Sequence, residues 1–171
     1  MQSNFPNINE IGAQTPDATI ATKLSIIIAS QANDLVVRRL IDGAKRSLLT
    51  NGIPLKNQYL LQVPGALEIP MALKRAVLSG KFSIFVVVGA VIKGKTDHYD
   101  HVARMANDGT LNIAIRHGLA LGNGILTVHS LEHALERADG PNGNLGYDAA
   151  NAAIKLHNSF LELEKVVNSN E

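Results

Sequence analysis

Apolar residues are concentrated in four short runs along the chain, and longer segments with a helical spacing of apolar positions separate these runs. The runs are rich in Val, Ile and Leu and are bounded by Gly, Pro or Asn. This pattern is typical of strands that are buried on both faces of a sheet. The predicted strands cover residues 23–30, 57–63, 82–92 and 123–128.

The segments between the runs predict α-helices, because apolar residues recur there every three or four positions and Gly stands just past several of their ends. The first segment places Val37, Leu40, Ile41, Ala44 and Leu48 on one face. The predicted helices cover residues 34–50, 67–79, 98–117, 131–138 and about 146–166. The last helix is expected to pack against the core through Ala149, Ala152, Ala153, Leu156 and Phe160.

Strands that alternate with single helices imply right-handed crossovers and a parallel sheet that is covered on both faces. We therefore predict an α/β fold: a three-layer α/β/α sandwich with a four-stranded parallel sheet, in a flavodoxin-like arrangement. The predicted domain spans residues 23–166. Residues 1–22 are polar and aperiodic, and they predict a flexible arm that is also able to dock on a neighbouring subunit. Residues 167–171 are expected to form a tail.

The overall composition narrows the classes of function. At 171 residues and 46% hydrophobic content, the chain is able to bury a core. It has 16 Lys and Arg against 15 Asp and Glu, so no charge bias favours nucleic acid or an anionic membrane as a partner. The lack of Cys excludes disulfides, thiolate metal sites and a cysteine nucleophile, and is compatible with the cytoplasm.

Ligands of parallel α/β sheets bind beyond the carboxyl ends of the strands, so the residues that follow each predicted strand are candidates for a site. The third strand is followed by Gly94, Lys95 and Thr96 at the start of a helix, where free backbone N–H groups favour an anion. With a hydroxyl and an ammonium beside them, these groups suit a phosphate. The alternative is that Gly94 only forms a turn and that Thr96 or Asp97 only caps the helix.

His98 is expected in the first turn of the same helix, beside any anion that binds there. A neutral imidazole is suited to carry protons for chemistry on such a ligand. His101 lies one turn further and completes a His-x-x-His pattern. A zinc centre needs at least three protein ligands, and both Cys and the His-Glu-x-x-His pattern are missing. We therefore expect no metal site, and we assign His101 to the surface or to an interface.

Four segments together resemble one known family. They are VPGALEIP at 63–70, GAVIKGKTDHYDHV at 89–102, GILTV at 124–128 and LERADGPNGNLG at 135–146. In this order and at this spacing they are similar to the 6,7-dimethyl-8-ribityllumazine synthases, over roughly residues 23–160. The resemblance implies a condensation of 5-amino-6-(D-ribitylamino)uracil with 3,4-dihydroxy-2-butanone 4-phosphate, the penultimate step of riboflavin biosynthesis, without metal or other cofactor.

The resemblance also assigns roles to individual residues. His98 matches the family's proton-transfer histidine, while Lys95 and Thr96 match the pair that holds the substrate phosphate. Arg137 matches an arginine that closes on this phosphate, normally from the neighbouring subunit. The pocket for the pyrimidine and its ribityl chain matches Ala32, Ala66, Leu67, Glu68, Ala90, Val91, Ile92 and Asn123. Without the resemblance, these residues are most simply interpreted as turn, strand, core or surface positions.

Three positions differ from the residues that are common in the family. An aromatic residue usually stands at the position of Ala32, a phenylalanine at that of Asn123 and a lysine at that of Leu145. The loss of an aromatic stack costs only about 0.5–1.5 kcal/mol, which weakens binding without abolishing it. The retention of His98, Thr96 and Arg137 together favours an active enzyme. The alternative is a weakly active or inactive paralogue that binds flavin or lumazine or acts as a scaffold.

The family's shared sites imply a cytoplasmic homo-oligomer with active sites between neighbouring subunits, and a homopentamer as the minimal unit. Riboflavin synthase is a further partner that the resemblance suggests. Larger shells built from pentamers also occur, and the turn between the last two helices helps to set the contact between pentamers. Here Pro141 biases Asp139 and Gly140 toward extended geometry, which favours a pentamer or a decamer over the shell.

Overall fold

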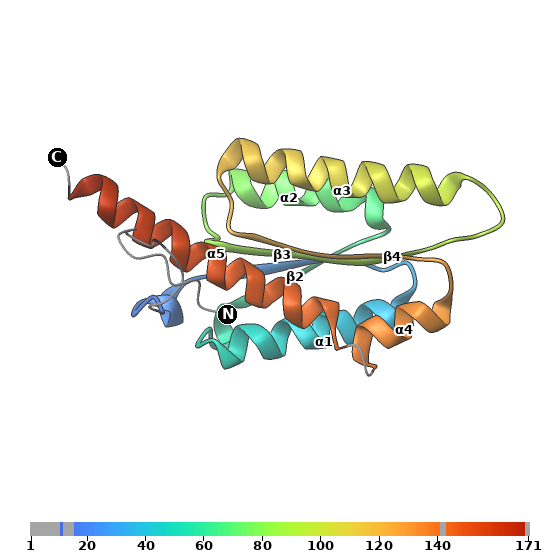
Figure 1. Cartoon of the computed structure of the whole chain (residues 1–171), viewed down its shortest axis with the longest axis horizontal. Helices are drawn as coiled ribbons and strands as arrows, with labels where there is room; N and C mark the ends of the chain where they lie inside the picture. The colour runs from blue at the N-terminus through green and yellow to red at the C-terminus, as the bar shows by residue number, and fades with distance from the viewer. Residues whose placement is uncertain (1–10, 12–15, 141–142, 170–171) are drawn as a thin grey trace, which may run out of the picture.

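The computed structural model describes residues 11, 16–140 and 143–169 and contains a parallel sheet between two layers of helices (Figure 1). The predicted α/β/α sandwich with a four-stranded parallel sheet is confirmed. β4 begins before the predicted residue 123, because Leu121 already pairs with Phe85. Along the chain, the strands are β1 (Ser25–Ser30), β2 (Gln58–Val63), β3 (Ile84–Ile92) and β4 (Leu121–Val128). Their order across the sheet is β2-β1-β3-β4.

Helices α1, α4 and α5 cover one face of the sheet, and α2 and α3 cover the other (Figure 1). Their bounds are α1 (Asp34–Thr50), α2 (Ile69–Leu78), α3 (His98–His117), α4 (Leu131–Asp139) and α5 (Leu145–Asn168). α1 and α3 have the predicted bounds. The helix predicted from residue 67 is divided into a 3-10 turn, η3 (Ala66–Glu68), and α2, because Pro70 fits only the first turn of an α-helix. Within the described ranges, no helix is long and apolar enough to cross a membrane.

The core consists of two layers, one on each face of the sheet. Alternate residues of a strand point to opposite faces, so Ile27 and Val86 pack under α1 and α5, whereas Ile28 and Val87 pack under α2 and α3. All of β1 and most of β3 are buried, as expected for the two central strands.

The buried face of α5 differs from the predicted one. Ala149 and Ala153 are buried as predicted, but Ala152 is exposed, and the buried face continues through Ile154 and His157. The cause is close backbone packing, which sequence periodicity does not reveal. A Cβ atom on Gly146 would lie 2.0 Å from the carbonyl oxygen of Leu40, so α5 rests directly on α1 and this contact sets its rotation.

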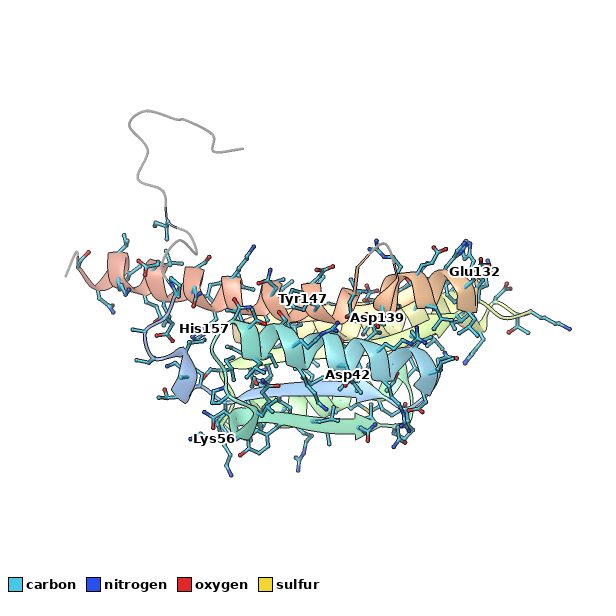
Figure 2. The ribbon with its side chains drawn as sticks, turned by 90° about the horizontal axis from the view of Figure 1, so that it is seen from below. Asp42, Lys56, Glu132, Asp139, Tyr147 and His157 are labelled. Atoms are coloured by element: carbon cyan, nitrogen blue, oxygen red, sulfur yellow. The ribbon has the colours of Figure 1, made fainter. Side chains whose placement is uncertain are left out.

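The described part of the N-terminal segment contacts α5. Figure 2 shows His157 on α5 beside this segment, and its Nε2 atom lies 3.2 Å from Oδ2 of Asp17. Asp17 also accepts hydrogen bonds from the backbone N–H and the hydroxyl of Thr19, each at 2.8 Å. Burial alone would raise the pKa of Asp17, but the hydrogen bonds from Thr19 and His157 outweigh it and hold that pKa below its usual value of 3.8.

Three predictions concern residues that lie partly or wholly outside the described part of the chain. Residues 1–10 and 12–15 of the predicted arm are outside it, and so are the last two residues of the predicted tail, 170–171. The turn argument for the assembly rests on Pro141, which also lies outside the described residues.

Candidate active site

A cavity of about 340 Å³ lies beyond the carboxyl ends of β1, β2 and β3, where α3 begins. It combines the loop after each of these strands with the first turn of α3. The residues that line it are Ala32, Asn33, Gly65, Ala66, Leu67, Glu68, Ala90, Val91, Ile92, Gly94, Thr96, His98, Tyr99 and Val102. The structure therefore brings together the predicted candidates from the loops after all three strands, as the strand-end rule requires.

The loop after β1 is held by backbone hydrogen bonds to the end of β2. Gln31 donates to the carbonyl oxygen of Val63 at 2.8 Å, and Ala32 donates to that of Pro64 at 3.1 Å. These bonds extend the parallel pairing of β1 and β2 past the ends of both strands. Ala32 is therefore fixed at the cavity wall, which it lines with a methyl group.

The loop after β2 provides a second wall through η3. Ala66 is buried, and Leu67 and Glu68 are half-buried. The carboxylate of Glu68 folds back over Gly65, where an added Cβ atom would lie 3.0 Å from Oε2. Gly65 therefore leaves the space that lets Glu68 point along the cavity wall.

The third wall is the last part of β3. Ala90 and Val91 are buried and Ile92 is half-buried. Pairing with β4 continues to the end of the strand, since Ile92 is in register with Val128, and Lys93 donates to the carbonyl oxygen of Val128 at 2.9 Å. This wall is therefore an extended segment that is paired on its β4 side and borders the start of α3.

The N-terminus of α3 presents polar groups to the cavity. Thr96 and His98 are exposed and line it, and no hydrogen bond joins the His98 side chain to any described residue. Asp97 occupies the N-cap position without a side-chain hydrogen bond, so the first-turn N–H groups receive no capping bond from it. The geometry suits an anion at the helix start, with an imidazole beside it. Lys95 is exposed between Gly94 and Thr96 but is not part of the lining.

Four lining residues were not predicted as site residues by the sequence analysis: Asn33, Gly65, Tyr99 and Val102. Tyr99 stands between two basic side chains, with Lys93 Nζ 5.8 Å from its ring centre and the ring of His129 6.2 Å away. Val102 follows Tyr99 on the same side of α3, so a helical projection of the first turn of α3 would have found both. Asn33 precedes a helix, where asparagine normally indicates only a cap.

Besides Lys95, two other predicted site residues do not line this cavity within one chain. Asn123 lies on the edge strand β4, where its Nδ2 atom donates to Oδ1 of Asn107 at 2.7 Å. It borders a second, mainly apolar cavity of about 410 Å³, whose lining includes residues of α3 and α5. Arg137 is exposed on α4, which packs on the opposite face of the sheet from α3, and it forms no ion pair with a described residue.

No three His, Asp or Glu side chains within residues 11, 16–140 and 143–169 are grouped in a way that could hold a metal ion. The polar groups of the main cavity are the imidazole of His98, the hydroxyls of Thr96 and Tyr99, the carboxylate of Glu68, the amide of Asn33 and backbone groups at three strand ends.

The comparisons with known proteins agree on one family. A sequence model described as 6,7-dimethyl-8-ribityllumazine synthase matches residues 23–160. A protein of that name from Nautilia profundicola is 43% identical over 137 residues, which are 80% of this chain and 89% of the relative. Proteins of the same name are 41% identical in Campylobacter curvus, over 80% of this chain and 88% of the relative, and 40% identical in Campylobacter jejuni subspecies doylei, over 83% and 92%.

Proposed function

The chain belongs to the 6,7-dimethyl-8-ribityllumazine synthase family, and we propose that its main cavity is where 5-amino-6-(D-ribitylamino)uracil condenses with 3,4-dihydroxy-2-butanone 4-phosphate. The protein is a transferase of riboflavin biosynthesis, and its product is 6,7-dimethyl-8-ribityllumazine. The relatives carry the enzyme's name, which favours an active enzyme over a paralogue that binds the product but turns over poorly. The observation that carries the proposal is the convergence of His98, Thr96 and the three strand-end walls on one cavity.

The phosphate of the butanone substrate is proposed to bind at the start of α3. Backbone N–H groups and the positive end of the helix dipole attract it, and the Thr96 hydroxyl donates one hydrogen bond. Lys95, exposed beside Thr96, supplies a positive charge. An anion anchored here places the carbon chain of the substrate beside His98.

His98 is proposed to transfer protons during the condensation. The amine of the pyrimidine adds to the substrate ketone and loses water to form an imine, phosphate then leaves, and a second condensation closes the ring. Each step moves a proton to or from a reacting atom, and an imidazole without a competing hydrogen bond is suited to this task.

The pyrimidine and its ribityl chain are proposed to lie against the walls at residues 65–68 and 90–92. The apolar wall residues exclude water from the faces of the ring, and backbone groups at the strand ends are available for its edge. Glu68 provides an acceptor for hydroxyl groups of the ribityl chain. Holding both substrates in one orientation converts a bimolecular step into an effectively unimolecular one.

We propose that a neighbouring copy of the chain completes this cavity with Asn123 and Arg137. In one subunit the main cavity adjoins β1, β2 and β3, whereas Asn123 lies at the far edge of the sheet on β4. A contact between two different surfaces of identical chains is heterologous, and such contacts close into rings. From the family resemblance, we propose a ring of five subunits. We also propose that the enzyme works in the cytoplasm and that riboflavin synthase is a further partner.

The test of this function is the formation of the lumazine from both substrates, followed by absorbance, in wild-type protein and in His98→Ala. We expect His98→Ala to lower turnover by about 10²- to 10⁴-fold, the usual range for a positioned acid or base. The control is His101→Ala, one turn further along α3 and outside the cavity lining, which should change the rate little. Near-normal turnover of His98→Ala would remove this histidine from the mechanism.

A further inference from the structure

Asn33 stands out from every other described residue in its backbone. It is the one residue other than glycine with a positive φ in the part of the chain that the structure describes, at φ 57° and ψ 44°. L-residues avoid this left-handed conformation because Cβ crowds the following carbonyl, and asparagine is among the few that tolerate it. Such conformations persist only where surrounding contacts require them.

The side chain of Asn33 makes a contact that a helix cap would not make. Asn33 occupies the N-cap position of α1, but its side chain accepts no hydrogen bond from the helix. Instead, Nδ2 donates to the carbonyl oxygen of Ala90 at 2.7 Å. This hydrogen bond connects the loop after β1 to the end of β3, directly beside the cavity.

The register of the sheet explains why Ala90 accepts this bond. Pairing between β1 and β3 ends at Ala29 and Val88, whereas β3 continues to Ile92 along β4. The end of β3 therefore has no strand partner on the β1 side, and the Asn33 amide takes the place of one. On its other side, the same loop is bonded through Ala32 to the carbonyl oxygen of Pro64.

We propose that Asn33 is a positioning residue, which sets the distance between the two walls that hold the pyrimidine. The loop of residues 31–33 is bonded to the segment after β2 by its backbone and to the end of β3 by the Asn33 side chain. Loss of the side-chain bond leaves the fold intact but lets the wall at residues 90–92 move relative to that at 65–68. The identity of the ligand in this inference rests on the proposed function. The effect on the position of the two walls rests on the Asn33 hydrogen bond alone.

The test compares Asn33→Gly with Asn57→Ala. Glycine adopts the left-handed conformation freely, so Asn33→Gly removes the side-chain bond without straining the backbone. Asn57 offers a matched control, because its Nδ2 atom also donates to a distant carbonyl oxygen, that of Ala21 at 2.8 Å, and it does not line the cavity.

In Asn33→Gly we expect the KM for the pyrimidine to rise roughly tenfold, the effect of losing about one hydrogen bond, and the KM for the butanone phosphate to change less than about twofold. Asn57→Ala should lower the unfolding midpoint but leave both KM values unchanged. Unchanged KM values in Asn33→Gly would overturn the proposal, and so would an equal rise of both, since that indicates a general loss of structure.

Hydrogen exchange separates this proposal from the proposed function. If the wild-type protein forms no lumazine, the proposed function fails. Hydrogen exchange at the amides of residues 90–92 still shows whether the Asn33 bond holds this wall in place. We expect these amides to exchange faster in Asn33→Gly than in wild type while the amides of β1 stay protected. Equal exchange in both proteins would show that the Asn33 bond does not hold this wall.

Discussion

The helices on the two faces of the sheet differ in how many of their residues are buried within one subunit. On one face, α5 buries Ala150, Ala153 and Ile154 against the sheet and α1, and glycines bring the backbones into contact. On the other face, α3 is 20 residues long, yet Ala106 and Thr110 are its only buried residues in the described subunit.

The exposed surface of α3 carries large apolar side chains among its polar ones. Met105, Leu111 and Ile115 are all exposed, and Ile115 keeps 71% of its surface accessible. The second cavity lies beside them, between α3, α5 and the edge strand β4. Exposed apolar side chains that border an apolar cavity favour an interface at this place. The α1, α4 and α5 layer packs closely within the chain, and we call it the finished layer. We propose that a neighbouring copy covers the α3 layer, which we call the unfinished layer.

The strongest test of the finished layer is Gly122→Ala. A Cβ atom at this buried position would lie 1.9 Å from the carbonyl oxygen of Ala149, and backbone cannot move aside as a flexible side chain can. We expect a loss of about 3 kcal/mol in the free energy of unfolding, at the upper end of the usual cost of overpacking. Urea denaturation measures it.

Gly94→Ala is the control, because nothing lies within 4 Å of its added Cβ atom, and its stability should change by less than about 0.5 kcal/mol. Equal stability of Gly122→Ala and wild type would contradict the close packing of α5 on β4.

The unfinished layer is tested by Ile115→Glu. In an isolated subunit this exposed position tolerates a charge, so the helical circular dichroism spectrum should be unchanged. In an assembly that buries this face, the carboxylate would lose its hydration, at a cost of about 2 kcal/mol or more for each contact. We therefore expect sedimentation to show smaller species than wild type.

The matched control is Leu49→Glu on α1, whose side chain is also exposed but belongs to the finished layer, and it should sediment like wild type. Dissociation caused by Leu49→Glu but not by Ile115→Glu would reverse the assignment of the two layers.

The smallest effect concerns acid stability at the edge of the finished layer. Asp17 has a pKa below 3.8 in the folded state, and its side chain is 8% exposed beside His157. A carboxyl group with a lowered pKa in the folded state stabilises the fold at pH values above its pKa in the unfolded state. This contribution is lost as the pH falls through the pKa of the folded state. Wild type should therefore exceed Asp17→Asn in unfolding free energy at neutral pH, and the gap should close below about pH 3.8. A gap that does not depend on pH would exclude the Asp17 carboxylate as its source.

The sequence predicted the sheet and the bounds of α1 and α3 correctly, because the apolar pattern and Gly118 are local signals. It placed Ala149 and Ala153 of α5 correctly but was wrong about Ala152, which is exposed. The close contact of Gly146 with the carbonyl of Leu40 is not visible in the sequence. At the site, the strand-end rule led to Thr96 and His98. Asn33 was missed because its role depends on Ala90, a residue 57 positions away that only the fold brings near.

In the proposed shared site, one chain supplies His98 and its neighbour supplies Arg137. The most direct test unfolds His98→Ala and Arg137→Ala together, refolds them as mixed oligomers, and measures lumazine formation. We expect activity to rise from near zero in each variant alone to about a quarter of the wild-type value, the statistical share of pockets that receive an intact residue from each chain. Mixed oligomers of wild-type size that stay as inactive as the separate variants would contradict a shared site.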